Sequence, residues 1–265
     1  MIANYHTHTY RCGHAEGNEG EYVKEAVKAG LKILGFSDHT PYDFFDIGPR
    51  NRPMRMKPEE LPGYVQSLKN LRAEYRDRLE ILIGVEVEYY PKYFPRLKEI
   101  LKANNIEYVI LGQHFLNNEV DGPYCGAPTG DEAVLAQYVS QSAEALHTRM
   151  FTYFAHPDLI HFTGSDDIYK KHMRVLAAEA KKSGTPLEIN LLGLSERRNY
   201  PAERFWEIAA EEGNTVVLGC DAHRPEGLSV PQAEEEAREM AERLGLKLEN
   251  TVPVRRLKDI SFSVL

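Results

Sequence analysis

Cysteine is scarce in this sequence, which has three cysteines, Cys12, Cys125 and Cys220, among 265 residues. An odd, sparse count without paired spacing argues against a disulfide framework and fits a reducing compartment. Cys12 and Cys220 lie close in the sequence to histidine-containing motifs. Free cysteine usually behaves as a small buried apolar residue, so we assign none of the three to a site.

Long apolar runs and an excess of basic residues are also absent. No apolar stretch approaches the roughly 20 residues that cross a bilayer, and the first residues lack the pattern of a signal peptide. Lysine and arginine number 32 against 40 acidic residues, so the formal net charge is -8. This balance disfavours membranes and long nucleic acids as partners. We expect a cytoplasmic protein, and the sequence leaves its oligomeric state open.

Short β-rich runs alternate with amphipathic helical runs, and no linker rich in proline, glycine or serine divides them. This alternation predicts one α/β domain over residues 1–265 with a parallel sheet. No glycine-rich phosphate loop follows the first strand, which disfavours a nucleotide-binding doubly wound fold. The expected strands cover residues 2–5, 32–37, 81–87, 108–111, 151–155, 186–190 and 215–218. The expected helices cover residues 20–29, 58–78, the run after Pro91, 131–147 (capped by Asp131), about 168–182, 201–212 and 231–244.

Polar side chains follow nearly every expected strand. His6 and His8 are one residue apart, so on a strand both point to the same face, where two imidazoles can bind one divalent ion. Asp221 and His223 repeat this spacing after the last strand. The candidate metal ligands are His6, His8, His14, His39, Glu86, His114, His156, Asp221 and His223. Because one rim must gather them all, we expect the sheet to close into a seven-stranded TIM-like barrel.

Nine ligands exceed what one ion uses, since zinc takes three or four protein ligands. Two or three divalent ions are therefore expected. A carboxylate is the natural bridge between cations because its two oxygens can face different ions, and Glu86 is the first choice. Glu88 would lie on the same face of the strand and is either a partner of the ligands or the bridge itself. His147, His161 and His172 are expected to be ordinary helix or loop residues.

These motifs resemble those of the polymerase-and-histidinol-phosphatase (PHP) superfamily, and within it the histidinol-phosphate phosphatases. The resemblance runs through nearly the whole chain. The segments that carry it are residues 5–15 (YHTHTYRCGHA), 34–41 (LGFSDHTP), 84–88 (GVEVE) and 219–225 (GCDAHRP). Together they are highly specific for the superfamily and less specific for the substrate.

The resemblance implies a distorted seven-stranded β/α barrel with a trinuclear site at its carboxyl-terminal rim. The implied ligand sets are His6, His8, Glu86 and Asp221 for one ion, Glu86, His114 and His156 for a second, and His14, His39 and His223 for a third. Similar proteins hold zinc, iron or manganese, and an imidazole-rich site suits all three.

Two departures from the family pattern concern the substrate rather than the hydrolytic chemistry. Gly112-Gln113-His114 stands where Gly-Ser-Val-His is usual. Asn190-Leu191-Leu192-Gly193-Leu194 replaces the usual Asn-Thr-Ala-Gly-Leu after the sixth strand. The first change is one residue shorter and reshapes the wall beside His114 without removing this ligand.

The expected reaction is hydrolysis of a small phosphorylated metabolite, with histidinol phosphate as the leading substrate. Clustered dications lower the pKa of bound water from about 15.7 to about 7, so a metal-bridging hydroxide can attack phosphorus. The expected catalytic residues are Glu86, as the bridge, and Asp221 or His223, as donor of a proton to the leaving oxygen. Arg197 and Arg198 are the expected phosphate-binding residues because guanidinium pairs bidentately with phosphate oxygens.

Other functions stay open at this stage. A PHP-type phosphodiesterase or 3′-exonuclease would act on short nucleotides, and a non-catalytic module would only bind metal. An amidohydrolase-like barrel shares the His-x-His start but not the motifs after the second and third strands. The loop over residues 40–57 carries aromatic residues and arginines, and it is either a lid over the site or a plain surface excursion.

Overall fold

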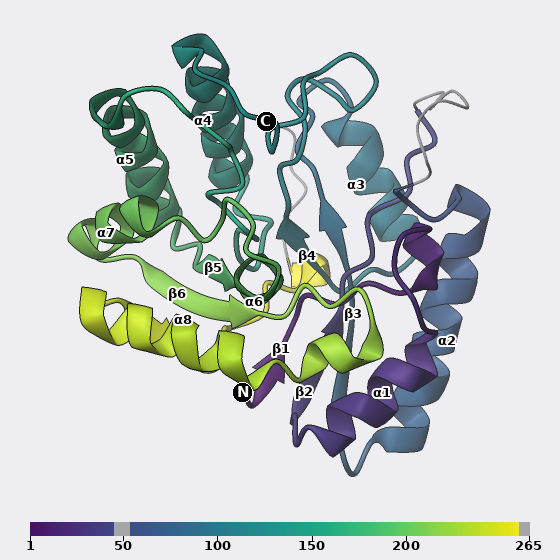
Figure 1. The fold of residues 1–265 in the computed structure, drawn as a ribbon. Helices are drawn as coiled ribbons and strands as arrows, with labels where there is room; N and C mark the ends of the chain where they lie inside the picture. The colour runs from purple at the N-terminus through teal and green to yellow at the C-terminus, as the bar shows by residue number, and fades with distance from the viewer. Residues whose placement is uncertain (45–53, 260–265) are drawn as a thin grey trace.

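The computed structural model describes residues 1–44 and 54–259, with a curled parallel sheet and helices around its outside (Figure 1). The strands are β1 (Ala3–Asn4), β2 (Ile33–Phe36), β3 (Glu80–Val87), β4 (Tyr108–Leu111), β5 (Leu187–Asn190), β6 (Thr215–Gly219) and β7 (Lys247–Glu249). The helices are α1 (Glu19–Lys28), α2 (Leu61–Tyr75), α3 (Phe94–Ala103), α4 (Glu132–His147), α5 (Asp166–Ser183), α6 (Leu191–Ser195), α7 (Glu203–Glu212) and α8 (Pro231–Leu244). In these two ranges no helix is long and apolar enough to cross a membrane.

The sheet has two parallel parts, β1-β2-β3-β4 and β5-β6-β7. Phe154 joins them, since it forms parallel bridges to Leu111 on β4 and to Leu187 on β5. Another parallel bridge links Thr7 to Ala222, beyond the ends of β1 and β6. The predicted α/β fold with a curled parallel sheet is confirmed, whereas a complete seven-stranded barrel is not.

Two strands differ from the expectation. The segment 151–155 makes hydrogen bonds on both sides, from Thr152 N to Val109 O and from Phe154 N to Pro186 O, but forms bridges only at Phe154. The backbone then turns at His156, whose φ is 32°, and this ends the pairing. The sequence did not predict β7, because three residues that alternate polar and apolar give too short a pattern.

The inner face of the sheet carries three buried tyrosines, Tyr5, Tyr108 and Tyr153, among aliphatic residues. Tyr108 crosses the interior, and its hydroxyl lies 2.8 Å from the carbonyl oxygen of Tyr5 and 3.0 Å from that of Phe36. Its ring occupies the space above Gly35 and Gly84, where a Cβ would lie 2.2 Å and 2.3 Å from the nearest tyrosine atoms. The two glycines therefore make room for the Tyr108 ring inside the sheet.

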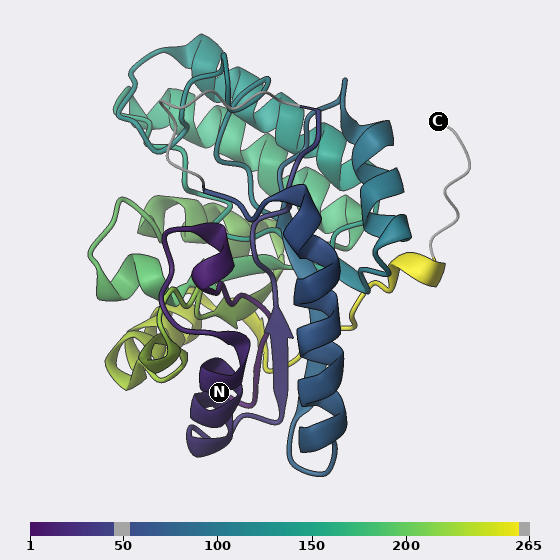
Figure 2. The same ribbon diagram turned by 90° about the vertical axis from the view of Figure 1, so that its right-hand side faces the viewer.

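Helices cover the outer face of the sheet (Figure 2). Among them, α2 packs against β3. As predicted, the Asp131 side chain caps α4 by accepting a hydrogen bond from Ala133 N. Gly184, with a φ of 64°, ends α5 in the left-handed conformation that suits glycine. In the expected lid loop, residues 45–53, including Arg50 and Arg52, lie outside the described residues, so the choice between lid and surface loop stays a prediction.

Candidate metal centre

The site lies where the parallel strands end at the carboxyl rim. His6 and His8 follow β1 and are fully buried, with their ring centroids 5.1 Å apart. Their backbone is held by hydrogen bonds across the sheet, from His8 N to Ala222 O and from Ala222 N to His6 O. The two imidazoles therefore face one place, as the spacing predicted.

Glu86, at the end of β3, is the centre of one half of the site. Its Oε2 lies 3.0 Å from His39 Nδ1 and 3.4 Å from His8 Nε2. Its Oε1 lies 3.1 Å from His156 Nε2 and 3.7 Å from His114 Nε2. The two oxygens thus face different histidines, which is the arrangement expected of a bridging carboxylate.

Asp221 is the second carboxylate of the site. Its Oδ1 lies 3.3 Å from His6 Nε2 and 3.2 Å from His8 Nε2. On the outer side, His223 Nε2 is 3.0 Å from His14 Nε2. All nine candidate ligands therefore lie in one cluster at the rim, while their roles as ligands stay a prediction.

The cluster fits divalent cations on chemical grounds. Among the described residues, the buried Glu86 Oε2, which faces the cluster, has no hydrogen-bond partner. Buried polar atoms are rarely left without one, unless a bound group satisfies the site. Several triplets have donor atoms within 4.8 Å of one another, and they include His6, His8 and Glu86, His6, His156 and Asp221, and His8, His39 and His223. Imidazole and carboxylate donors at such distances suit zinc, iron or manganese.

The electrostatics leave the carboxylates ionised. Burial alone would raise the pKa of Glu86, but His39, His114 and His6 hold it well below its usual range. Asp221 is also buried, and His6 and His8 hold its pKa well below the usual range. Negative oxygens are therefore available at neutral pH.

The histidines divide according to their neighbours. Burial and the nearby His223 lower the pKa of His8 to about 3, so its imidazole is neutral. Burial lowers the pKa of His39 well below its usual range, against the effect of Glu86. Burial also works against protonation of His6, but Asp221, Glu188 and Glu86 raise its pKa well above the usual value. The surrounding carboxylates therefore favour a positive charge at His6. A metal cation bound at Nε2, which faces Asp221, would supply this charge in place of a proton.

Glu188 is a member of the site that the sequence interpretation missed. This fully buried residue of β5 lies with Oε1 2.8 Å from His6 Nδ1, and its Oε2 accepts a hydrogen bond from His156 N. A carboxylate behind a ligating histidine fixes the ring and raises its basicity. Asn190 donates hydrogen bonds to both Glu188 and Asp221. The available signal was a charged residue between the apolar Leu187 and Ile189 of a strand.

Two glycines make room for these carboxylates. A Cβ at Gly112 would lie 1.8 Å from Glu86 Oε1, and one at Gly219 would lie 1.7 Å from Glu188 Oε1. Both glycines follow or end strands that neighbour the strand of the carboxylate. The acids can therefore turn into the rim only because the adjacent strand has no side chain there.

The two candidate phosphate-binding arginines are placed differently. Arg198 donates hydrogen bonds of 2.7 Å to Tyr200 Oη and to Glu196 Oε2, and the Tyr200 ring lies 5.6 Å from that of His156. Arg197 is exposed over 75% of its side chain and is paired with Glu236 on α8. The structure therefore gives Arg198, but not Arg197, a connection to the ligand cluster.

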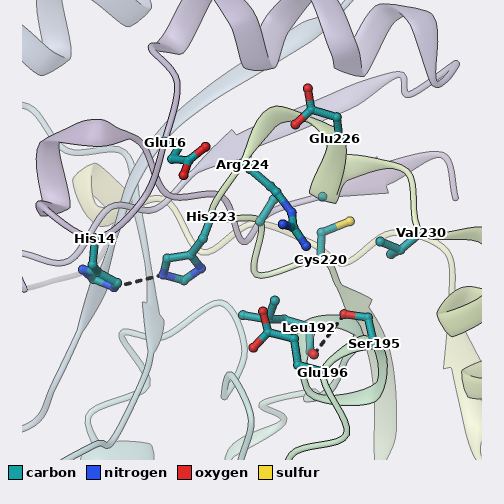
Figure 3. A pocket seen from close by; sticks show the side chains of 12 residues that line it. His14, Glu16, Leu192, Ser195, Glu196, Cys220, His223, Arg224, Glu226 and Val230 are labelled. Atoms are coloured by element: carbon teal, nitrogen blue, oxygen red, sulfur yellow. Dashed lines mark hydrogen bonds between the residues drawn. The ribbon is translucent and has the colours of Figure 1, made fainter.

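A cavity of about 610 Å³ opens beside the cluster (Figure 3). His14 and His223 form one wall, and Arg224 extends toward its interior. Acidic side chains, including Glu16 and Glu196, lie around it. Its volume is in the usual range for a small-molecule site.

Comparisons with known proteins agree with this picture. Residues 4–191 match the family described as PHP domain. A Deinococcus radiodurans protein named probable histidinol-phosphatase is 32% identical over 238 residues, covering 84% of this chain and 87% of that protein. Bacillus subtilis histidinol-phosphatase is 26% identical over 257 residues, covering 83% of this chain and 92% of its own.

A solved structure shares the fold. Histidinol phosphate phosphatase from Lactococcus lactis, in complex with zinc, L-histidinol and phosphate, superposes with a TM-score of 0.74 at 18% sequence identity. The match covers 98% of each chain.

Fold and site together define an α/β protein with a histidine-and-carboxylate donor cluster, suited to divalent metals, at the carboxyl rim of a parallel sheet. The family match and the relatives go one step further. The chain belongs to the PHP domain family, and the resemblance drawn from its motifs is confirmed.

Proposed function

We propose that the protein is a metal-dependent phosphatase that hydrolyses L-histidinol phosphate to L-histidinol and phosphate. The observation that carries this proposal is the convergence of nine candidate ligands around Glu86 and Asp221. The similarity to relatives supports it as well: two proteins named probable histidinol-phosphatase and histidinol-phosphatase match this chain over most of their length.

The proposed centre holds three divalent ions, zinc, iron or manganese, at the rim of a closed barrel. The proposed sets are His6, His8, Glu86 and Asp221, then Glu86, His114 and His156, then His14, His39 and His223. The two faces of Glu86 support a shared ligand between the first two sets. The Thr7–Ala222 bridge supports closure of the sheet.

Bound divalent ions supply Lewis acidity and lower the pKa of water to about 7. The chain itself binds and orients the substrate. Arg198 is the proposed phosphate-binding residue, which its hydrogen bond to Tyr200 beside the cluster supports, and Arg197 is the second candidate. The cavity next to His14 and His223 receives the alcohol part of the substrate.

A proton must reach the leaving oxygen. Asp221 and His223 remain the candidates, and the structure favours His223 because it lines the cavity and is 22% exposed, against 5% for Asp221. Its Nδ1 donates to the carbonyl oxygen of Asp221 at 2.9 Å, which fixes the ring. The other nitrogen, Nε2, lies 3.0 Å from His14 Nε2, so His223 can give up a proton there only while this nitrogen does not bind an ion.

The test is a substrate panel measured with defined metals. L-histidinol phosphate, p-nitrophenyl phosphate and bis-p-nitrophenyl phosphate are assayed with protein that is first stripped and then loaded with zinc, iron or manganese. The proposal expects the highest kcat/KM for L-histidinol phosphate. A preference for the diester would instead support a phosphodiesterase, and loaded protein that is inert on the whole panel would leave a non-catalytic metal-binding domain.

A further inference from the structure

An arginine that belongs to none of the family motifs is buried behind the metal centre. Arg55 follows the loop after β2 and is 6% exposed. Its Nε and Nη2 donate to Glu119, its Nη2 also donates to Glu88 Oε1 at 2.7 Å, and its Nη1 donates to the carbonyl oxygen of Thr40 at 3.2 Å. Its guanidinium carbon lies 4.3 Å from the centre of the Tyr42 ring.

These contacts join three successive loops of the rim. Thr40 and Tyr42 follow β2, Glu88 follows β3, and Glu119 lies between β4 and α4. A guanidinium offers several donors in one rigid plane, so all the acceptors together fix its orientation. An ammonium group is a single point of charge and cannot reproduce this fork.

Glu88 passes the contact on to the metal centre. Its Oε1, the atom that Arg55 contacts, lies 3.3 Å from His114 Nδ1. Its Oε2 accepts hydrogen bonds from Tyr90 Oη and from Phe115 N. The opposite nitrogen of His114, Nε2, lies 3.7 Å from Glu86 Oε1. The imidazole therefore stands between two carboxylates, of which Glu86 faces the centre and Glu88 faces away from it.

We propose that Arg55 is a positioning residue of the metal centre. Arg55 holds Glu88 beside Nδ1 of His114 and so fixes the orientation of the imidazole ring. Nε2 of His114 then faces the position where Glu86 and His156 would hold an ion. Glu119 contributes to this arrangement, because its carboxylate accepts hydrogen bonds from Arg55 and fixes the guanidinium on the side away from Glu88. This inference rests on the metal centre of the proposed function and is independent of the substrate.

The experiment measures metal binding without substrate. Stripped wild-type protein is titrated with Zn²⁺ against a chromophoric chelator, and the same is done for Arg55→Lys, Arg55→Met, Glu88→Gln and the double variant Arg55→Lys/Glu88→Gln. Partners behind a metal ligand typically contribute about 10- to 100-fold in affinity. We expect Kd to rise by about that factor for one of the bound ions in each single variant, with the others unchanged.

The double variant should lose no more affinity than Glu88→Gln alone, because both changes interrupt one path. Arg96→Met is the control, since Arg96 is exposed and pairs with Asp43 at the start of the same loop. Its Kd values should equal those of the wild type. Melting of the metal-free proteins, followed by circular dichroism, separates positioning from simple stabilisation.

A folded Arg55→Lys protein that binds every ion as tightly as the wild type overturns the inference, even if it melts at a lower temperature. Additive losses in the double variant overturn it as well. If Arg55→Met does not fold, Arg55→Lys and Glu88→Gln decide. Wild-type protein that binds no Zn²⁺ would instead contradict the proposed function.

Discussion

The two ends of the parallel sheet surround their acidic side chains with different partners. At the amino end, Glu107 accepts hydrogen bonds from both Nη atoms of Arg72 at 2.7 Å, from Arg256 at 3.1 Å and from Ile83 N at 3.2 Å. At the carboxyl rim, Glu86 faces histidines, and its Oε2 has no hydrogen-bond partner in the described part of the chain.

The difference lies in the partners. Arginine brings a permanent charge and several donors, so a carboxylate beside it is satisfied by the protein alone. A neutral imidazole brings a lone pair, and a group of them around a carboxylate leaves free valences that a cation can take up. Glu107 at the amino end is therefore expected to stabilise the fold, and Glu86 and Asp221 at the rim are expected to hold metal.

Removal of the ions is the strongest test of this contrast. Chelation, or the double change His6→Ala/His8→Ala, should lower kcat/KM by about a thousandfold or more, because metal ions contribute several kcal/mol to the transition state. Elemental analysis measures the loss of metal, and steady-state kinetics measure the fall in kcat/KM. His147→Ala is the matched control, because His147 is exposed and pairs with Glu179 on the outer surface. Stripped protein with full activity would contradict the proposed chemistry.

Glu188→Gln tests whether a buried acid behind the ligands belongs to the site. The change keeps the size of the side chain but removes the charge beside His6 Nδ1. We expect a loss of about 10- to 100-fold in metal affinity or activity. Glu132→Gln, at an exposed residue paired with His172, is the control and should leave both quantities unchanged. Equal metal binding in Glu188→Gln and wild type would assign Glu188 to the fold alone.

Arg198→Ala should raise KM for a phosphomonoester by about tenfold or more, since a hydrogen bond to a charged group contributes about 1.5–3 kcal/mol. Arg197→Ala should change KM less, because the Arg197 side chain is 75% exposed, against 39% for Arg198. Initial rates across a range of substrate concentrations check the order of the two effects. Unchanged kinetics in both variants would remove the arginines from phosphate binding.

Glu107→Gln should act on stability and not on activity. Burial opposes the charged form, but Arg72 and the Ile83 amide lower the pKa of Glu107 below 4.5. The ionised group therefore stabilises the fold above about pH 4.5, and this contribution disappears as the pH falls through the lowered pKa. We expect a loss of about 1–2 kcal/mol near pH 7 in urea unfolding, and a smaller difference from wild type in acid. If Glu107→Gln lowered kcat and left the free energy of unfolding unchanged, the proposed difference in role between the two ends of the sheet would be wrong.

The sequence was informative where a local pattern determines the outcome. The spacing of His6 and His8 fixes their common face, and the end of each strand places one more polar residue at the same rim. The role of Glu188 was not predicted, because its partner His6 is 182 residues away in the sequence. Only the folded structure brings the two residues together. The separation of Arg198 from Arg197 also depends on tertiary structure, since Arg197 has a φ of 54° and turns toward α8.

The two glycines beside the carboxylates extend the functional site to residues that carry no chemistry. At Gly112 or Gly219 a single methyl group would occupy the volume of a carboxylate oxygen, so alanine there would displace Glu86 or Glu188 without altering any ligand. In a library of random variants, such clones would keep every histidine and acid and still lose their metal. Screens that follow only the polar residues would overlook this way of inactivating the protein.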